Sequence, residues 1–414
     1  IWAVSMAIGH SLGGSALTAL GPRVAPARGV LIAVVISAAA SAWLPDAHLS
    51  PKTIWLLALT VFVAGACWET FALRKITPAV RLLLVGNLSE ASTLLQDVRF
   101  GRGGGYEVIG VVADAHLPED QDPRAPWLGH VFQLDRVIAE NTPDLVVLTG
   151  HDEPAATFSR LLDAAQAGFR VVQLTEFYEY AFGRVPIENL PHDWFMSVLH
   201  LYQRHYSRAV KRALDLVGTS LLLLLTFPLF PLLALFVLQT DGPVILRQVR
   251  LGEHGNLFTI YKFRTMRADA EASGTAVWAA DHDPRLTKAG GVMRRLRLDE
   301  LPQLWNVIRG DMSLVGPRPE RPEFLSALEH VPFWTRRHLI KPGLTGWAQV
   351  RQGYAASADE TATKLSYDFW YLRHRSLTVD LAILMRTVLV VLQGDRSARR
   401  STAPVAAKVA DSRD

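Results

Sequence analysis

The chain has 414 residues, which exceeds one ordinary hydrophobic core and predicts two or three domains. Half of its residues are hydrophobic, mean hydropathy is +0.17, and the apolar residues gather in long runs typical of membrane segments. The formal net charge of +4 suits phosphorylated substrates and an anionic lipid surface but is too small to indicate nucleic acid. The single cysteine, Cys67, excludes a disulfide framework and a zinc cluster of cysteines.

Apolar stretches near the start predict transmembrane helices at 1–20, 29–44 and 53–73, within a membrane domain at 1–75. Basic residues lie between the first two stretches and after the third, but only Lys52 lies between the second and the third. By the positive-inside rule, everything after residue 75 faces the cytoplasm. Because the sequence starts at Ile1, already apolar, we expect an earlier span to be missing; a secretory signal is the alternative for this run.

A fourth apolar run, at 213–239, is long enough to cross a bilayer but contains Pro228 and Pro231 in its middle. Basic residues flank both of its ends, including Lys211 and Arg250. This pattern favours a re-entrant helix that enters and leaves by the same face. A kinked helix that crosses fully is the alternative.

Between the membrane domain and this run, strands are expected at 82–86, 108–112, 145–148 and 170–174, with a helix after the first strand through Val98. Alternating strands and helices predict a Rossmann-like parallel α/β domain at 79–178, followed by a linker at 179–207. The glycine fingerprint of dinucleotide sites is missing after Gly86, and Gly103 to Gly105 do not open a helix after a strand. A regulatory or structural role is therefore favoured over dinucleotide binding.

A basic, tryptophan-containing region follows the fourth apolar run and predicts a C-terminal α/β catalytic domain at 208–394. Its last apolar segment, 381–392, is too short to span and is expected at the membrane interface or in the core. The segment 395–414 is rich in alanine, serine and charge and predicts a disordered tail.

Two adjacent carboxylates, Asp299 and Glu300, follow three arginines, Arg294, Arg295 and Arg297. Adjacent side chains on a helix do not face each other, so the two could take separate roles, one as nucleophile and one as metal ligand. Spacing alone leaves a solvated surface as the alternative.

Further basic residues have the chemistry of phosphate ligands. Arg318 is fixed between two prolines, and guanidinium groups bind phosphate oxygens through paired hydrogen bonds. Lys262 and Arg264 follow a strand-like segment at 257–261. The histidines, including the one in Asp281-His-Asp283, show no repeated metal-ligand spacing.

Taken together, four ordered motifs resemble the bacterial sugar transferase family, the polyprenyl-phosphate hexose-1-phosphate transferases: KFRTM at 262–266, LDELPQ at 298–303, GDMSLVGPRPE at 310–320 and KPGLTGWAQV at 341–350. The N-terminal spans and the Rossmann-like segment are similar to those of its large members, which initiate exopolysaccharide or capsule repeat units. The stretch FYEYAFGRVP at 177–186 further resembles the branch associated with exosortase systems.

The resemblance implies a mechanism. Asp299 would attack the sugar-linked phosphate of a UDP-sugar, releasing UMP and forming a phospho-aspartate intermediate that polyprenyl phosphate then attacks. Glu300 would hold Mg²⁺. Arg294 and Arg318 match phosphate-binding positions, and the resemblance extends a substrate-binding role to Lys262, Arg264 and Glu320.

The resemblance also supports the re-entrant reading, with the catalytic domain on the cytoplasmic face of the bacterial inner membrane. The family often has serine before the helix-breaking proline, whereas this chain has Phe227, which leaves the geometry of the break open. The oligomeric state is open as well, a homodimer being one option, and the sequence does not name the sugar. Two other functions remain as alternatives: a membrane-bound nucleotide-sugar dehydratase or epimerase, and a scaffold for polysaccharide assembly.

Overall fold

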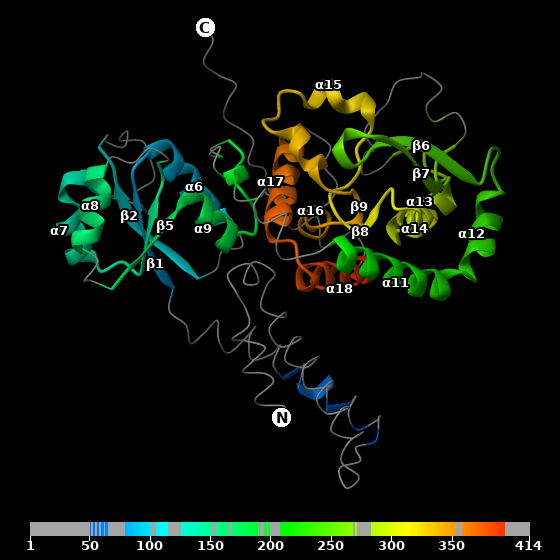
Figure 1. The fold of residues 1–414 in the computed structure, drawn as a ribbon, viewed down its shortest axis with the longest axis horizontal. Coiled ribbons are helices and arrows are strands. Elements are labelled where there is room, and N and C mark those ends of the chain that lie inside the picture. The colour runs from blue at the N-terminus through cyan, green and yellow to red at the C-terminus, as the bar shows by residue number, and fades with distance from the viewer. Residues whose placement is uncertain are drawn as a thin grey trace. The chain divides into compact units, whose positions relative to one another are not determined.

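The computed structural model divides the chain into two compact units, unit 1 (Ile1–Gly183) and unit 2 (Arg184–Asp414), which are described separately (Figure 1). The residues it describes are 50, parts of 53–64, 79–100, 105–114, 126–150, 155–164, 168–188, 190, 194–196, 198, 208–267, 270, 283–352 and 358–393. The predicted spans at 1–20 and 29–44, most of 53–73 and the predicted tail at 395–414 lie outside these residues.

Unit 1 is built on a five-stranded sheet in the order β3-β2-β1-β4-β5, with every neighbouring pair parallel. The strands are β1 (Val80–Val85), β2 (Tyr106–Val112), β3 (Trp127–Gly129), β4 (Leu145–Leu148) and β5 (Arg170–Gln173). The predicted parallel α/β sheet is therefore confirmed. The sequence did not indicate β3, because three residues are too few for a recognisable apolar pattern.

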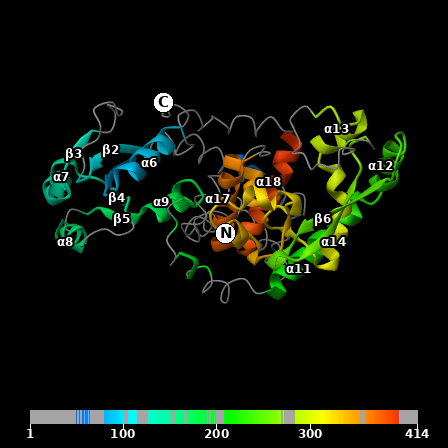
Figure 2. The ribbon, with the colours of Figure 1, turned by 90° about the horizontal axis from the view of Figure 1, so that it is seen from above.

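Helices cover both faces of this sheet, as the two views in Figures 1 and 2 show. On one face α6 (Leu88–Phe100) and α9 (Leu174–Ala181) bury a core that includes Leu84, Leu94 and Phe177. On the other, α7 (Leu134–Asn141) and α8 (Ala155–Ala164) bury a second core around Val85 and Ile138. A short 3₁₀ turn, η3 (Val131–Gln133), precedes α7.

At the carboxyl edge of the sheet, the start of α6 is occupied by its own capping residue. The Asn87 side-chain oxygen accepts from the backbone N–H of Ser89 at 2.9 Å and of Glu90 at 3.4 Å. Thr149, from the end of β4, donates its hydroxyl to the carbonyls of Val85 and Asn87. Because these N–H groups already have a protein acceptor, the start of α6 is not an open helix terminus of the kind that holds phosphate in dinucleotide sites.

Unit 2 contains two small sheets within its described residues. The antiparallel pair is β6 (Ile245–Leu251) with β7 (Leu257–Phe263), and the parallel pair is β8 (Ser313–Val315) with β9 (Gly343–Thr345). The other elements are α11 (Arg208–Thr226), α12 (Leu229–Val237), η5 (Glu253–Gly255), α13 (Lys288–Arg295), η6 (Leu298–Gln303), α14 (Leu304–Arg309), η7 (Pro322–Phe324), α15 (Leu325–Leu328), η8 (Trp334–Leu339), α16 (Trp347–Arg351), α17 (Ala358–His374) and α18 (Leu377–Gln393).

The predicted re-entrant run forms α11 and α12, which are bent by 67° at Phe227 and Pro228. Pro231 lies in the first turn of α12, where its missing N–H costs the helix no hydrogen bond. In the described part of the chain, no one helix has both the length and the apolar composition of a membrane span, whereas this bent pair meets the test jointly.

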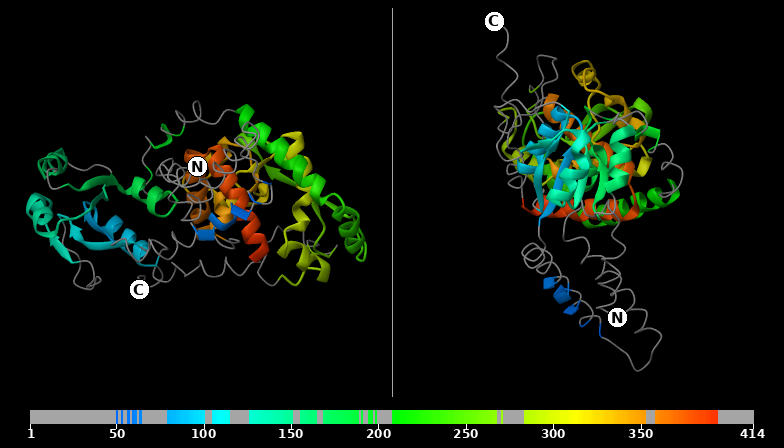
Figure 3. Two further views of the ribbon diagram at one scale, coloured as in Figure 1. Left: turned by 90° about the horizontal axis from the view of Figure 1, so that it is seen from below. Right: turned by 90° about the vertical axis from the view of Figure 1, so that its left-hand side faces the viewer.

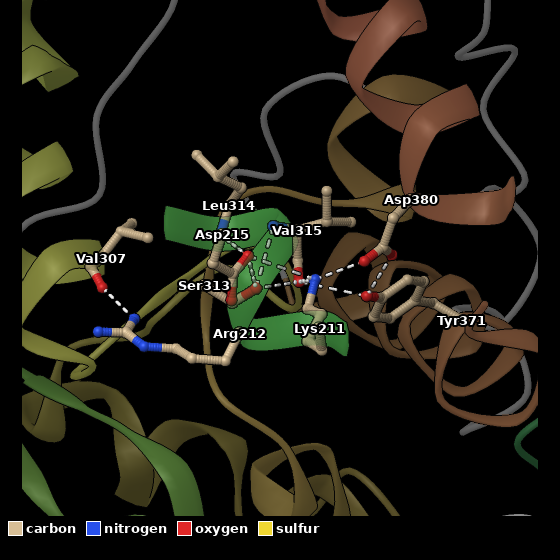
Figure 4. Close-up of polar contacts among 9 residues, drawn as sticks. All are labelled: Lys211, Arg212, Asp215, Val307, Ser313, Leu314, Val315, Tyr371 and Asp380. Atoms are coloured by element: carbon tan, nitrogen blue, oxygen red, sulfur yellow. Dashed lines mark hydrogen bonds and ion pairs between the residues drawn. The ribbon is translucent and has the colours of Figure 1, made fainter. Parts of the chain in front are cut away.

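A buried polar network ties α11 to α18 and to β8 (Figure 4). The Lys211 ammonium donates to Asp380 Oδ2 at 2.5 Å and to the Val315 carbonyl at 3.0 Å. Asp215, one turn further along α11, accepts from the hydroxyl of Ser313 at 2.9 Å. Figures 1 and 3 show α11 and α18 along the same side of unit 2.

Arg212 makes a further tertiary contact from α11. Its guanidinium donates to the carbonyls of Val307 and Ile308, which lie near the C-terminal end of α14. Lys211 and Arg212, which the sequence offered as basic flanks of a membrane segment, therefore also anchor α11 to the rest of unit 2.

Candidate active site

Asp299 and Glu300 lie in the 3₁₀ turn η6, and both are buried, with exposed fractions of 7% and 4%. The preceding residue, Arg297, adopts a left-handed conformation with φ of 57°, which is uncommon for a residue other than glycine. Burial of both carboxylates excludes the solvated-surface alternative for this pair.

Hydrogen bonds from Asn306 fix η6 and α14 against the strand β7. Asn306 is fully buried, donates to the Thr259 carbonyl at 2.7 Å and accepts from the Tyr261 N–H at 3.3 Å. Lys262, the next residue of β7, is thereby held beside the acid pair. The motifs at 262–266 and 298–303 thus form one structural unit.

Arg318 reaches the acid pair from the loop that follows β8. Its Nη2 donates to Glu300 Oε1 at 2.8 Å, and Arg297 Nη1 lies 3.8 Å from the same oxygen. The loop itself is held by backbone contacts, because Arg337 donates to the carbonyl of Arg318 and Arg250 donates to that of Pro319. The proline-flanked arginine thus lies at the acid pair with a carboxylate as its partner, and its predicted role as a phosphate ligand stays a prediction.

Three glycines permit the close approach of the segments that carry this loop. A Cβ on Gly316 would lie 2.5 Å from the Lys341 carbonyl, one on Gly343 would lie 2.1 Å from Gly316 N, and one on Gly346 would lie 2.2 Å from Gly316 O. Only residues without a side chain allow this backbone contact. Gly316, Gly343 and Gly346 are thus explained by packing.

The two carboxylates differ in their electrostatic surroundings. Burial, together with the neighbouring Glu300, raises the pKa of Asp299 above its usual range, against the opposing effect of Lys262 and Arg294. Burial also acts to raise the pKa of Glu300, but Arg318 and Arg297 outweigh it and hold that pKa well below its usual range. Environments that separate the pKa values of paired acids are typical of groups with different catalytic roles.

The other predicted phosphate ligands fall into two sets. Lys262 lies at the acid pair, where burial and the neighbouring Arg318 lower its pKa to about 7. Arg294, from the last turn of α13, acts electrostatically on Asp299 and donates to the Thr265 hydroxyl at 3.0 Å.

Arg264, by contrast, binds backbone. Its guanidinium donates to the carbonyls of Val237, the last residue of α12, and of Thr240 and Asp241, which follow it. The structure therefore places Arg264 as a cap on the bent helix pair. It is 6% exposed.

Glu320 and the two prolines lie apart from the acid pair. The Glu320 Oε1 lies 3.7 Å from Arg337 Nη1, and its backbone carbonyl accepts from the Leu251 N–H. Pro228 lies at the bend between α11 and α12, and Pro231 lies in the first turn of α12.

The structure adds basic residues that the sequence did not single out for the site: Arg250, Arg337 and Lys364, which interact electrostatically with Arg318, Glu320 or both. They come from β6, η8 and α17 and are far apart along the chain. Arg250 and Lys364 have no motif around them, and Arg337 follows another arginine, Arg336, so only the fold identifies these residues.

Comparisons with known proteins identify the family of this chain. The model of the bacterial sugar transferase family matches residues 206–394. A UDP-galactose-lipid carrier transferase of Erwinia amylovora is 37% identical over 365 residues, covering 82% of this chain and 74% of that protein. The chain therefore belongs to the bacterial sugar transferase family.

Two further relatives are covered less completely. The chain is 39% identical over 246 residues to a UDP-N-acetylgalactosamine-undecaprenyl-phosphate N-acetylgalactosaminephosphotransferase of Aeromonas hydrophila, covering 59% of this chain and 57% of that protein. It is 31% identical over 316 residues to a UDP-glucose:undecaprenyl-phosphate glucose-1-phosphate transferase of Escherichia coli, covering 74% of this chain and 66% of that protein.

Proposed function

We propose that this protein transfers a hexose 1-phosphate from a UDP-sugar to undecaprenyl phosphate and releases UMP, as the first step of an exopolysaccharide or capsule repeat unit. The observation that carries the proposal is the buried pair Asp299 and Glu300, with opposite pKa shifts, among the cations Lys262, Arg294 and Arg318. The names of the relatives support the class of donor and acceptor. Because those names differ in the sugar, the proposal extends to the hexose class only.

In the proposed reaction the Asp299 carboxylate attacks the phosphorus that carries the sugar. The bond from this phosphorus to the bridging oxygen breaks, and UMP leaves with the electron pair. Negative charge develops on phosphoryl oxygens during the transfer, and Arg294 and Arg318 are placed to stabilise it. A covalent intermediate divides a transfer from a soluble donor to a lipid acceptor into two simpler steps.

The residues at this site also fit Mg²⁺. Among the described residues, no group of three or more histidine, cysteine or acidic side chains could hold a metal by itself. Mg²⁺ does not require such a group, because it is commonly held by one or two carboxylates together with substrate phosphates. Glu300, which the cations keep ionised, would supply the carboxylate. When bound, the metal would neutralise diphosphate charge.

The placement at the membrane is part of the proposal. The bent pair exposes large apolar side chains, among them Leu224, Phe227 and Leu235 at 74%, 71% and 63%. Apolar side chains of α18, such as Met385 and Val388, are also exposed. An apolar surface of this kind on neighbouring helices supports a re-entrant insertion into the cytoplasmic face of the bacterial inner membrane.

The test is UMP release by the full chain from a panel of UDP-hexoses, with undecaprenyl phosphate and Mg²⁺. We expect Asp299→Asn to lower the rate by more than about a thousandfold, as loss of a catalytic nucleophile does, and chelation of Mg²⁺ to stop the reaction reversibly. Asp241→Asn, the same change at an exposed aspartate of unit 2, is the matched control and should retain wild-type turnover. Turnover by Asp299→Asn at the control rate would rule out the proposed nucleophile.

A further inference from the structure

A segment that the sequence predicts as part of a linker packs against helix α17 of unit 2. It consists of the described residues between 184 and 198, and we call it the strap. The Val185 N–H donates to the Ser366 carbonyl in α17 at 3.0 Å. Trp194 is 4% exposed, and its ring centroid lies 5.7 Å from that of Phe369 in the same helix. The strap is therefore a packed part of unit 2.

The strap also contacts the residue that begins the turn η8. The Phe195 ring centroid lies 5.6 Å from that of Phe369 and 4.9 Å from that of Phe333. Phe333 is the N-cap residue of η8, and its φ of 59° is uncommon for a bulky side chain. Strained backbone of this kind persists where the surrounding structure holds it. The strap therefore supports α17 and η8 at the same time.

These two elements carry a buried ion pair that reaches the candidate active site. Asp368, the neighbour of Phe369 in α17, accepts from Arg337 Nη2 in η8 at 2.7 Å, and both side chains are 3% exposed. The same nitrogen of Arg337 donates to the Arg318 carbonyl at 3.1 Å. A shift of either α17 or η8 would therefore move a donor that holds Arg318.

The loop that carries Arg318 has few hydrogen-bond donors of its own. Pro317 and Pro319 flank the arginine and have no N–H, so donors from other segments hold the loop by its carbonyls. Arg250 donates to the Pro319 carbonyl at 3.1 Å, as Arg337 does to that of Arg318. The position of the Arg318 side chain at the acid pair therefore depends on where these two donors lie.

We propose that Trp194 and Phe195 are positioning residues, which hold α17 and η8 in the arrangement that places Arg318 at the acid pair. This inference rests on the proposed function, in which Arg318 stabilises the charge that develops on phosphoryl oxygens. The strap lies outside residues 206–394, which the family model matches. It therefore adds a support for the active site to the part of the chain that the model covers.

Steady-state kinetics of UMP release by the full chain test this role with Trp194→Ala. We expect kcat to fall about tenfold or more, since a misplacement of about 1 Å costs up to about a hundredfold. KM for the UDP-sugar should change by less than about twofold, because Arg318 is proposed to act on charge that develops only in the transition state. Trp194→Phe keeps an aromatic ring against Phe369 and should restore most of kcat.

Met196→Ala is the matched control, because Met196 belongs to the strap but is 67% exposed, and it should turn over as the wild type does. In an Arg318→Ala background, Trp194→Ala should lower kcat by less than about twofold, because the residue through which it acts is absent. Equal losses in the two backgrounds, in variants that thermal unfolding shows to be folded, would overturn the proposal. Wild-type kcat in Trp194→Ala would do the same.

An experimental structure of the Trp194→Ala variant tests the strap without turnover. We expect the hydrogen bond from Arg337 to the Arg318 carbonyl to be broken, and the same bond still at 3.1 Å would contradict the positioning role. If the wild type released no UMP from any UDP-hexose, the proposed function would fail. The structure of the variant would then still decide whether the strap positions Arg318.

Discussion

Lys364 is a residue whose charge depends on pH in the alkaline range. Burial, together with the cations Arg318 and Arg337, lowers its pKa to about 8, against the opposing effect of the carboxylates Glu320 and Asp368. Raising the pH through 8 therefore removes the positive charge from Lys364 in the free protein. Lys364 and Arg318 line one hollow, so a phosphate dianion bound at Arg318 favours the protonated form of Lys364, and binding takes up a proton in this range.

We therefore predict that UMP affinity falls as the pH rises from 8 to about 10, because the phosphate of UMP is already fully ionised there. Titrations at several pH values would measure the slope. Lys364→Arg keeps its charge throughout and should give a nearly flat profile. A wild-type profile as flat as that of the arginine variant would contradict this role of Lys364.

The acid pair shows what residue types reveal before a structure exists. Asp299 and Glu300 were noted because they follow a cluster of arginines and were favoured over a solvated surface only through the four family motifs, whereas Arg318 was noted because prolines flank it. The guanidinium of Arg264 could not be assigned in this way, since the same donors serve a phosphate or a backbone carbonyl. The left-handed conformation of Arg297 was also beyond prediction, because arginine gives no local signal for it.

At the scale of elements, the network between α11 and α18 carries a stability prediction. Asp380 is fully buried, and its two oxygens accept from Lys211 and from the Tyr371 hydroxyl. Lys211→Met would leave this carboxylate buried without its cation, which typically costs about 3–5 kcal/mol. Thermal or denaturant unfolding in detergent should show this loss.

Arg247→Met is the control, since it removes a cation from an exposed position of β6 and should change stability by less than about 0.5 kcal/mol. The double variant Lys211→Met with Asp380→Asn should recover part of the lost stability, because the uncompensated charge is then absent. Additive losses in the double variant would indicate that the two residues do not interact.

The strands of unit 1 were predictable because a parallel strand buried on both faces is a continuous apolar run, as in β1 and β4. The same rule fails for β3, which has three residues. In unit 2 the bend at Pro228 was indicated by sequence, whereas the partners of Lys211 and Arg212 were not. Those partners come from β8, α14 and α18, and no local pattern connects segments so far apart.

At the scale of the molecule, the bent pair makes a topological prediction. If α11 and α12 enter and leave by one face, positions before and after the pair lie on the same side of the membrane. Cys67 is the single cysteine, so Cys67→Ser gives a background without thiols for Ser207→Cys and Asp241→Cys. An impermeant maleimide should label both positions in inside-out vesicles and neither in right-side-out vesicles. Labelling from opposite sides would establish a full crossing.

The link between Lys211 and Asp380 also bears on how the chain folds during synthesis. The two residues are 169 positions apart in sequence. At about 5–20 residues per second, the ribosome needs roughly 8–34 s to add the second after the first. Throughout that interval the charged start of α11 has been translated while its buried counter-ion has not. Unit 2 can therefore complete its packing only after α18, which carries Asp380, has been synthesised. A nascent chain stalled before α18 should remain sensitive to proteases.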